Sequence, residues 1–173
     1  MNVYLTGMPG SGKSTIAKML AEAIGYAALD LDSEIEKSAG CSISEIFALQ
    51  GEKAFRDMES QAVANAAKTD CQVVATGGGC ILRPENVEMM KESGLIVFID
   101  RPVEDILSDI ETGHRPLLKG GKQRILDLYA ERIGLYNERC DFCADGSGSC
   151  EDVMRVIKDI LAGQGLIQRD AAL

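Results

Sequence analysis

The stretch that decides the fold reads Gly7-Met8-Pro9-Gly10-Ser11-Gly12-Lys13-Ser14-Thr15. It matches the phosphate-loop pattern G-x-x-x-x-G-K-[ST] at every fixed position, follows an apolar run at residues 2–6 and precedes a helical pattern at residues 13–23. Glycines let backbone N–H groups point at a phosphate, and a helix N-terminus adds its positive end. We predict nucleotide binding, with Lys13 on the β- and γ-phosphates and the Ser14 hydroxyl on Mg²⁺. The predicted nucleotide-binding residues are Gly10, Ser11, Gly12, Lys13, Ser14 and Thr15.

Around this loop, short apolar runs alternate with longer amphipathic segments. Strands are expected at residues 2–6, 27–31, 72–75, 95–99 and 141–144. Helices are expected at residues 13–23, from 42 onward, at 53–68, 84–93, after 102, at 123–139 and at 150–161. The pattern S-I-S-E at residues 42–45 is a capping box, Gly51 interrupts the helical pattern that follows, and Pro84 lies near the start of its helix, where proline is tolerated. This alternation predicts parallel βαβ units in a three-layer α/β domain, with the carboxyl ends of the strands on the edge where ligands bind. A chain of 173 residues is about one domain, since roughly 150 residues is typical.

The composition limits the classes of partner. The net charge is −9, from 18 basic and 27 acidic residues. General binding of nucleic acid or of anionic membranes needs a basic face, so we expect neither partner. An anionic substrate would need a few basic residues gathered in one cleft. We see neither a run of about 20 apolar residues nor a signal peptide, and we expect a cytoplasmic protein.

The six cysteines are interpreted as thiols, because this domain is large enough to build its own core. Cys140 and Cys143 have CxxC spacing, with Cys150 nearby. These three are interpreted as packing and loop residues or, alternatively, as a metal or redox site. The single histidine, His114, lies on a different segment.

Asp30-Leu31-Asp32 ends the second expected strand. In an extended segment residues two apart face the same side, so both carboxylates could point into a cleft. One would serve Mg²⁺ and the other would accept the proton of a hydroxyl. The alternative is an N-cap or solvated turn that opens a helix.

Two further segments carry candidate ligand contacts. Arg56 and Glu59 are three residues apart on an expected helix. They form either a surface ion pair or an arginine held in place to grip a carboxylate. Gly77-Gly78-Gly79 follows a strand directly, and it is either a flexible turn or a loop whose N–H groups approach a small ligand.

The polar segment 112–121 contains His114-Arg115-Pro116-Leu117. An arginine on such a loop suits a lid that covers a transferring phosphoryl group. We interpret His114 as an exposed loop residue. The next helix carries Arg132, which taken alone would be a solvated surface residue.

Together these residues resemble the shikimate kinases. The resemblance runs from Val3 to about Leu161. The resemblance rests on six segments: GMPGSGKST at 7–15, LDLDSEIE at 29–36, GCSISEIFALQGEKAFRDMES at 40–60, TGGGCIL at 76–82, RPLL at 115–118 and ERIGLY at 131–136. The phosphate loop is common to many nucleotide enzymes, but the ordered combination is specific.

The resemblance implies a nucleoside-monophosphate-kinase-like P-loop fold with a five-stranded parallel sheet and a short lid. It implies a single kinase domain over residues 1–173, an acceptor-binding helical segment at about 31–62 and a lid at about 112–121. It also implies transfer of the ATP γ-phosphoryl group to the 3-hydroxyl of shikimate, in the chorismate and aromatic amino acid pathway. Mg²⁺ is the implied cofactor, and we expect a monomer.

The resemblance also implies roles for individual residues. Asp32 resembles the aspartate that binds the acceptor hydroxyls and acts as base, and Asp30 the one that reaches Mg²⁺ through water. Glu59 resembles the partner of the first acceptor-binding arginine. Arg115 resembles the lid arginine on ATP and on the transferring phosphoryl group. Four further residues resemble those around the acceptor carboxylate: Arg56, Gly78, Gly79 and Arg132.

The chain departs from the family pattern near the expected adenine site. The family often has a basic residue shortly before the lid arginine and another before the last helix, whereas residues 107–112 and 145–149 contain none. Two rival functions remain. One is a related kinase for gluconate or a nucleoside monophosphate, disfavoured by the arginine pair with the three glycines. The other is a regulatory nucleotide-binding module, disfavoured because Lys13, Ser14, Asp32 and Arg115 are all present.

Overall fold

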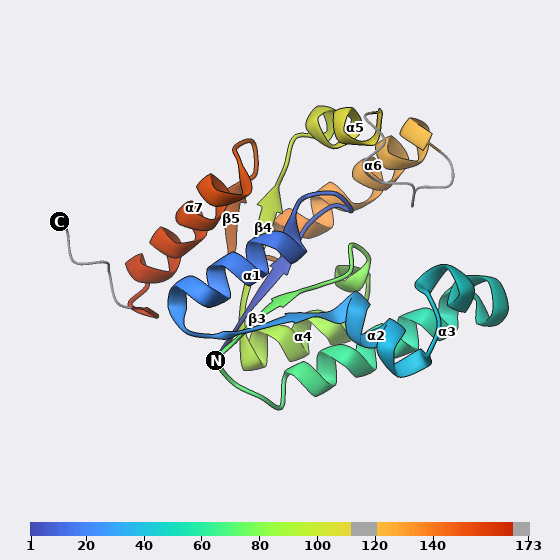
Figure 1. Cartoon of the computed structure of the whole chain (residues 1–173), viewed down its shortest axis with the longest axis horizontal. Coiled ribbons are helices and arrows are strands. Elements are labelled where there is room, and N and C mark those ends of the chain that lie inside the picture. Colours follow the sequence, from blue (N-terminus) through green and yellow to red (C-terminus); the bar gives the residue numbers. More distant parts are fainter. Residues whose placement is uncertain (112–120, 168–173) are drawn as a thin grey trace.

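The computed structural model describes residues 1–111 and 121–167. In this part of the chain, five parallel strands form one sheet in the order β2-β3-β1-β4-β5 (Figure 1). The strands are β1 (Asn2–Thr6), β2 (Ala27–Asp30), β3 (Gln72–Ala75), β4 (Gly94–Asp100) and β5 (Phe142–Asp145). Because all the pairings are parallel, every strand ends at the same edge of the sheet. The phosphate loop, Asp30 and the three glycines therefore lie along one edge, as predicted.

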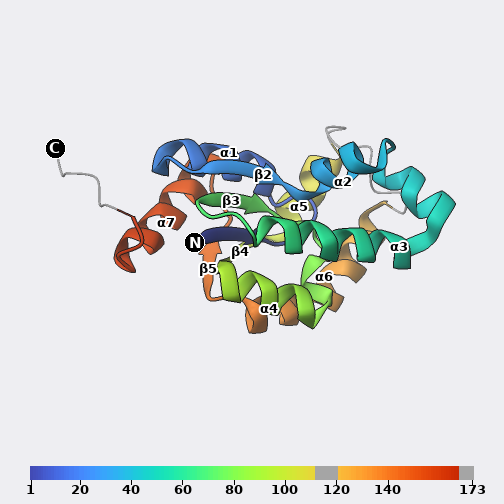
Figure 2. The same cartoon turned by 90° about the horizontal axis from the view of Figure 1, so that it is seen from below.

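Helices cover both faces of the sheet, which gives three layers (Figure 2). They are α1 (Lys13–Ile24), α2 (Leu31–Ala39), α3 (Ile43–Ala66), α4 (Pro84–Ser93), α5 (Val103–Glu111), α6 (Gly121–Arg139) and α7 (Cys150–Gly163), with a short 3₁₀ turn at Cys80–Leu82. Helices α1 and α7 pack on one face, and α3, α4 and α6 lie against the other.

The residue pattern of β1 explains this arrangement. All five of its residues are buried. Val3 and Leu5 pack with α1 and α7, whereas Tyr4 points to the opposite face and packs with α3 and α4. Side chains alternate along a strand, so a strand covered on both faces is apolar throughout. The short apolar run at residues 2–6 is thus the central strand, and the phosphate loop continues directly from it.

The predicted fold class is confirmed, with one local correction. The second strand was expected to reach residue 31, but β2 ends at Asp30 and α2 begins at Leu31. The interruption expected at Gly51 is present as a kink inside α3, where this glycine has the non-helical angles φ 82° and ψ 172°. Most of the expected lid, including His114 and Arg115, lies outside the described residues. No helix within residues 1–111 and 121–167 is long and apolar enough to cross a membrane.

Candidate active site

The phosphate loop connects β1 to α1 through three glycines with positive φ. Gly7, Gly10 and Gly12 have φ values of 147°, 93° and 88°. A Cβ atom on Gly7 would lie 2.8 Å from the carbonyl oxygen of Ile99, so a side chain is also excluded by space. The loop can wrap tightly only because these positions are glycine.

Lys13 reaches back over this loop from the first turn of α1. Its ammonium donates to the carbonyl oxygens of Gly7 and Met8 at 2.9 and 2.8 Å, and Ser11 Oγ lies 3.4 Å away. The side chain is buried, whereas Ser14 and Thr15 are exposed at the start of α1. The loop therefore combines a buried cation, a helix N-terminus and two accessible hydroxyls, as a triphosphate with Mg²⁺ requires.

Asp30 and Asp32 do not share the face of a strand, as their spacing had suggested. Asp30 caps α2, and its carboxylate accepts a hydrogen bond from the backbone N–H of Ser33 at 3.1 Å. Asp32 lies in the first turn of that helix. An N-cap at this position was the alternative considered above. An N-cap side chain satisfies a free N–H group at the start of a helix, so α2 begins at Leu31 and the strand ends one residue earlier than expected.

The carboxylate of Asp32 is partly buried. Its Oδ1 atom is inaccessible to solvent and has no hydrogen-bond partner within residues 1–111 and 121–167. Burial raises the pKa of Asp32, and the negative charge of Asp30 raises it further, while the positive charges of Lys13 and Arg56 lower it. A carboxylate with an unused acceptor atom and a raised pKa is suited to accept a proton from a substrate hydroxyl.

Arg56 is held by two carboxylates on its own helix. Its Nη1 donates to Glu59 Oε2 at 2.9 Å, and its Nη2 lies 3.2 Å from Glu52 Oε1. The Glu59 side chain is fully buried, and burial raises its pKa although Arg56 opposes the shift. The pair is therefore not the surface ion pair considered above. It fixes a guanidinium beside the candidate acceptor site.

The three glycines after β3 each lie against a different site residue. A Cβ on Gly77 would come within 2.8 Å of Asp32 Oδ1 and 2.6 Å of Glu59 Oε1. On Gly78 it would meet the Pro9 ring at 2.9 Å, and on Gly79 it would lie 2.6 Å from Arg56 Cζ. We call Gly77-Gly78-Gly79 the acceptor loop. Residues of α2, α3 and the phosphate loop lie against it, because its three positions carry no side chains.

Arg132 comes from α6 and is only 7% exposed. Its Nε atom lies 3.7 Å from Glu131 Oε1 and has no hydrogen-bond partner among the described residues. The positive charge of the guanidinium lowers the pKa values of Glu59 and Tyr136, against the burial that raises both. Arg132 is thus a buried cation of the same site, and not the solvated residue that its position on a helix suggests when taken alone.

Sequence reasoning missed two residues that contact the loops. Arg101, directly after β4, donates from Nη1 to the Gly10 carbonyl oxygen and to Asp109 Oδ2, both at 2.8 Å. Tyr136 donates to the phosphate and acceptor loops. The available signal for Arg101 was its place at the carboxyl edge of the sheet. For Tyr136 it was the four-residue spacing from Arg132, which places both on one face of α6.

The cysteines lie apart from this arrangement, except for two. All six are free thiols. Cys80 is buried behind the acceptor loop, and burial raises its pKa. A Cβ on Gly12 would lie 3.2 Å from Cys150 Sγ, so that thiol packs against the phosphate loop. No group of three or more metal-binding side chains occurs within the described ranges.

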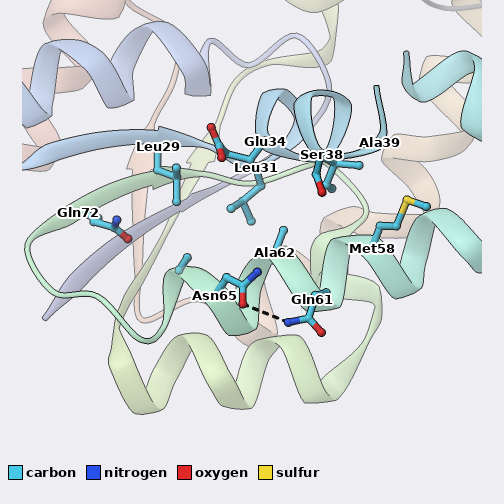
Figure 3. Close-up of a pocket in the computed structure, with 12 residues that line it drawn as sticks. Leu29, Leu31, Glu34, Ser38, Ala39, Met58, Gln61, Ala62, Asn65 and Gln72 are labelled. Atoms are coloured by element: carbon cyan, nitrogen blue, oxygen red, sulfur yellow. Dashed lines mark hydrogen bonds between the residues drawn. The ribbon is translucent and has the colours of Figure 1, made fainter. Parts of the chain in front are cut away.

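A cavity of about 490 Å³ lies between β2, α2 and α3 (Figure 3). Its lining is largely apolar, with Leu29, Leu31, Ile35 and Met58 among its residues. Gln61 and Asn65 join at its rim through a hydrogen bond of 3.1 Å. The residues that line this cavity do not include Asp32, Arg56 or Glu59. The cavity is therefore separate from the candidate active site.

Comparison with known proteins identifies the family of this chain. The family model described as shikimate kinase matches residues 9–162. The chain belongs to the shikimate kinase family. It is therefore an ATP-dependent kinase of shikimate, as the motifs predicted.

Individual relatives agree with that assignment. The chain is similar to a shikimate kinase of Clostridium botulinum, with 46% identity over 92% of this chain and 96% of the relative. The solved shikimate kinase of Acinetobacter baumannii, in complex with shikimate, has a TM-score of 0.87 and 33% identity, with 95% of this chain and 94% of that one covered. A gluconokinase from Sinorhizobium meliloti has a TM-score of 0.59 and 16% identity over 94% and 92% of the two chains, which shows only a shared fold.

Proposed function

We propose that this kinase transfers the γ-phosphoryl group of ATP to the 3-hydroxyl of shikimate, with Asp32 as the catalytic base. The observation that carries the proposal is the buried Oδ1 atom of Asp32, which lies against Gly77 of the acceptor loop and has no hydrogen-bond partner among the described residues. The positive charges of Lys13 in the phosphate loop and Arg56 on α3 both lower the pKa of this carboxyl group. A hydroxyl bound there would lie between the acceptor-binding arginine and the phosphate loop.

The acceptor carboxylate would bind to Arg56 and Arg132, beside Gly78 and Gly79. Both guanidiniums are largely buried, with side-chain exposures of 12% and 8%. A buried guanidinium fork matches a carboxylate bidentately and loses little solvation when it binds. Glu59 would hold Arg56 in position. This pocket explains how a chain with a net charge of −9 accepts an acid, since the local field and not the net charge decides binding.

ATP would lie on Gly10, Ser11, Gly12, Lys13, Ser14 and Thr15. Lys13 and the loop N–H groups would stabilise the charge that develops on the transferring phosphoryl group. Arg115 would neutralise the same charge from the lid, at about residues 112–121, whose closure would exclude water. Arg115 and most of that segment lie outside the described residues, so these two roles rest on the motif.

Mg²⁺ would be held by the Ser14 hydroxyl and, through water, by Asp30. The site fits a hard cation because the Ser14 side chain is exposed at the start of α1 and oxygen is the donor that Mg²⁺ prefers. When bound, the ion would supply charge neutralisation on the β- and γ-phosphates. Removal of Mg²⁺ by EDTA should then abolish transfer, and added Mg²⁺ should restore it.

Three broader expectations complete the proposal. Residues 1–173 would form one kinase domain in which about 31–62 bind the acceptor. The enzyme would act as a cytoplasmic monomer with small-molecule substrates, without nucleic-acid or membrane partners. The acidic net charge supports the expected absence of nucleic-acid and membrane partners.

The direct test is ADP release with ATP and Mg²⁺. Shikimate, gluconate, a nucleoside monophosphate and no acceptor are compared, and the position of the new phosphate is assigned by ³¹P–¹H NMR. We expect strong release with shikimate alone and a phosphate on the 3-oxygen. Release with another acceptor would mean that the arginines bind a different acid. ATP binding without release in any mixture would favour the regulatory module.

A further inference from the structure

Tyr136 of α6 contacts both substrate loops through one atom. Its hydroxyl lies 2.9 Å from the carbonyl oxygen of Gly7, which opens the phosphate loop, and 2.5 Å from that of Gly78 in the acceptor loop. The side chain is 1% exposed. Its ring stacks on Phe98 of β4, with centroids 4.9 Å apart and planes at 6°. The sheet therefore holds the phenol rigidly at the junction of the two loops.

The hydrogen bonds at this junction depend on one another. A phenol carries a single hydrogen, so it donates fully to only one carbonyl at a time. The Gly7 oxygen also accepts from the Lys13 ammonium at 2.9 Å. When Lys13 turns to a phosphate, Gly7 loses that donor and competes with Gly78 for the phenol. The positive charge of Arg132, one helical turn earlier on α6, lowers the pKa of Tyr136 against its burial, so the junction is also coupled to the proposed carboxylate-binding arginine.

We propose that Tyr136 is a positioning residue whose hydroxyl sets the spacing between the phosphate loop and the acceptor loop, and so between the donor phosphate and the acceptor hydroxyl. The proposal rests on the proposed function. Transfer needs reacting atoms about 3–3.5 Å apart, and a misplacement of about 1 Å can cost about 100-fold in rate. Tyr136 touches neither substrate itself, because it acts through the two carbonyl groups.

The competing explanation is that Tyr136 only stabilises the fold. Tyr4 provides a matched control, because it is also fully buried and its hydroxyl is also hydrogen-bonded, at 2.7 Å to Ser93 Oγ. The Tyr4 hydroxyl also accepts from Asn2, the first residue of β1, and Ser93 directly precedes the start of β4, so these bonds lie at the edge of the sheet opposite the phosphate loop. Tyr4→Phe and Tyr136→Phe thus remove the same atom from two buried sites, only one of which joins the loops.

The experiment measures kcat, the KM for each substrate, and the partition of ATP between shikimate phosphate and free phosphate. In Tyr136→Phe we expect kcat to fall by about 10- to 100-fold, both KM values to stay within about twofold, and the share of free phosphate to rise. Tyr4→Phe should keep the wild-type kcat and partition, even where its melting temperature falls equally. Wild-type kcat in Tyr136→Phe, a loss confined to KM, or the same loss in Tyr4→Phe would overturn the proposal.

A second variant covers the case in which Tyr136→Phe does not fold. Phe98→Leu keeps the hydroxyl but removes the ring that holds it, so kcat should again fall with little change in KM, and an unchanged kcat would overturn the proposal. The wild-type enzyme separates the two levels of inference. Absence of shikimate-dependent ADP release there would overturn the proposed function and this inference together. An active wild type with an unaffected Tyr136→Phe would overturn only the positioning role.

Discussion

The guanidinium of Arg56 lies directly against the backbone of Gly79, so that a Cβ on this glycine would come within 2.6 Å of Arg56 Cζ. Gly79 has φ −99°, which any residue adopts, so its role is to leave space and not to permit an unusual backbone. Hydrogen bonds to Glu52 and Glu59 restrain the guanidinium in this position. The arginine and the acceptor loop therefore form one surface.

Gly79→Ala should raise the KM for shikimate by about 10-fold or more, since Arg56 must move and charged hydrogen bonds to a ligand contribute about 1.5–3 kcal/mol. The KM for ATP should change less than twofold. Steady-state kinetics with each substrate varied in turn will measure both. Gly134→Ala is the control, because a Cβ there meets nothing within 4 Å, and it should leave both constants unchanged. An equal rise in both constants would argue against an acceptor site at Gly79.

Asp32→Ala should retain ATP binding but lose turnover by about 10²- to 10⁴-fold, the usual contribution of a positioned base. Calorimetry with ATP measures the first quantity and ADP release the second. Asp57→Ala, an exposed carboxylate on α3, is the comparison and should remain active. A near-wild-type kcat in Asp32→Ala would exclude its role as base.

The raised pKa of Asp32 predicts a pH dependence of activity. Because the base must be ionised, kcat/KM for shikimate should fall on the acid side with a midpoint above 3.8, the ordinary value for an aspartate. The profile is measured between about pH 4 and 9 at constant ionic strength, a range that brackets the shift expected for a buried carboxyl group. A kcat/KM that shows no fall down to about pH 4 would contradict the burial of this carboxylate in the working enzyme.

The same shift predicts that Asp32→Asn stabilises the fold at high pH. A carboxyl group whose pKa is raised by folding contributes stability below its unfolded pKa, and this contribution is lost as pH rises through the folded pKa. The melting temperature of Asp32→Asn should therefore exceed that of the wild type at pH 8, with a smaller difference near pH 4. Asp159→Asn, at an exposed position on α7, should change it little at either pH. Destabilisation by Asp32→Asn at pH 8 would show that the ionised carboxylate is well solvated or paired.

Arg132→Ala should raise the KM for shikimate by about 10- to 100-fold, in line with the loss of a charge-assisted bidentate contact, while the KM for ATP stays within about twofold. Initial rates with each substrate varied will measure the two constants. Arg155→Ala removes an exposed arginine from α7 and should change neither. If both constants rise together in Arg132→Ala, the arginine supports the whole site and does not bind the carboxylate in particular.

The sequence alone was enough for every feature that depends on local pattern. The phosphate loop, the capping box at Ser42 and the proline start of α4 are encoded within a few residues, and all are present in the structure. The apolar runs predicted the strands to within about two residues. Parallel strand pairing then placed the loops at one edge of the sheet, because βαβ crossovers allow only that arrangement.

Only the tertiary structure decided which side chains meet at that edge. Asp32 was expected either to face the cleft from an extended segment or to lie in a turn that opens a helix, and it lies in the first turn of α2 because Asp30 caps that helix. Gly77 brings Asp32 within reach of Glu59, although these residues are far apart in the sequence. Tyr136 contacts Gly7, which lies 129 positions earlier in the chain. No local sequence pattern encodes these contacts between distant residues, because they arise when α3 and α6 pack on the same face of the sheet. That packing brings the separate motifs together in one site.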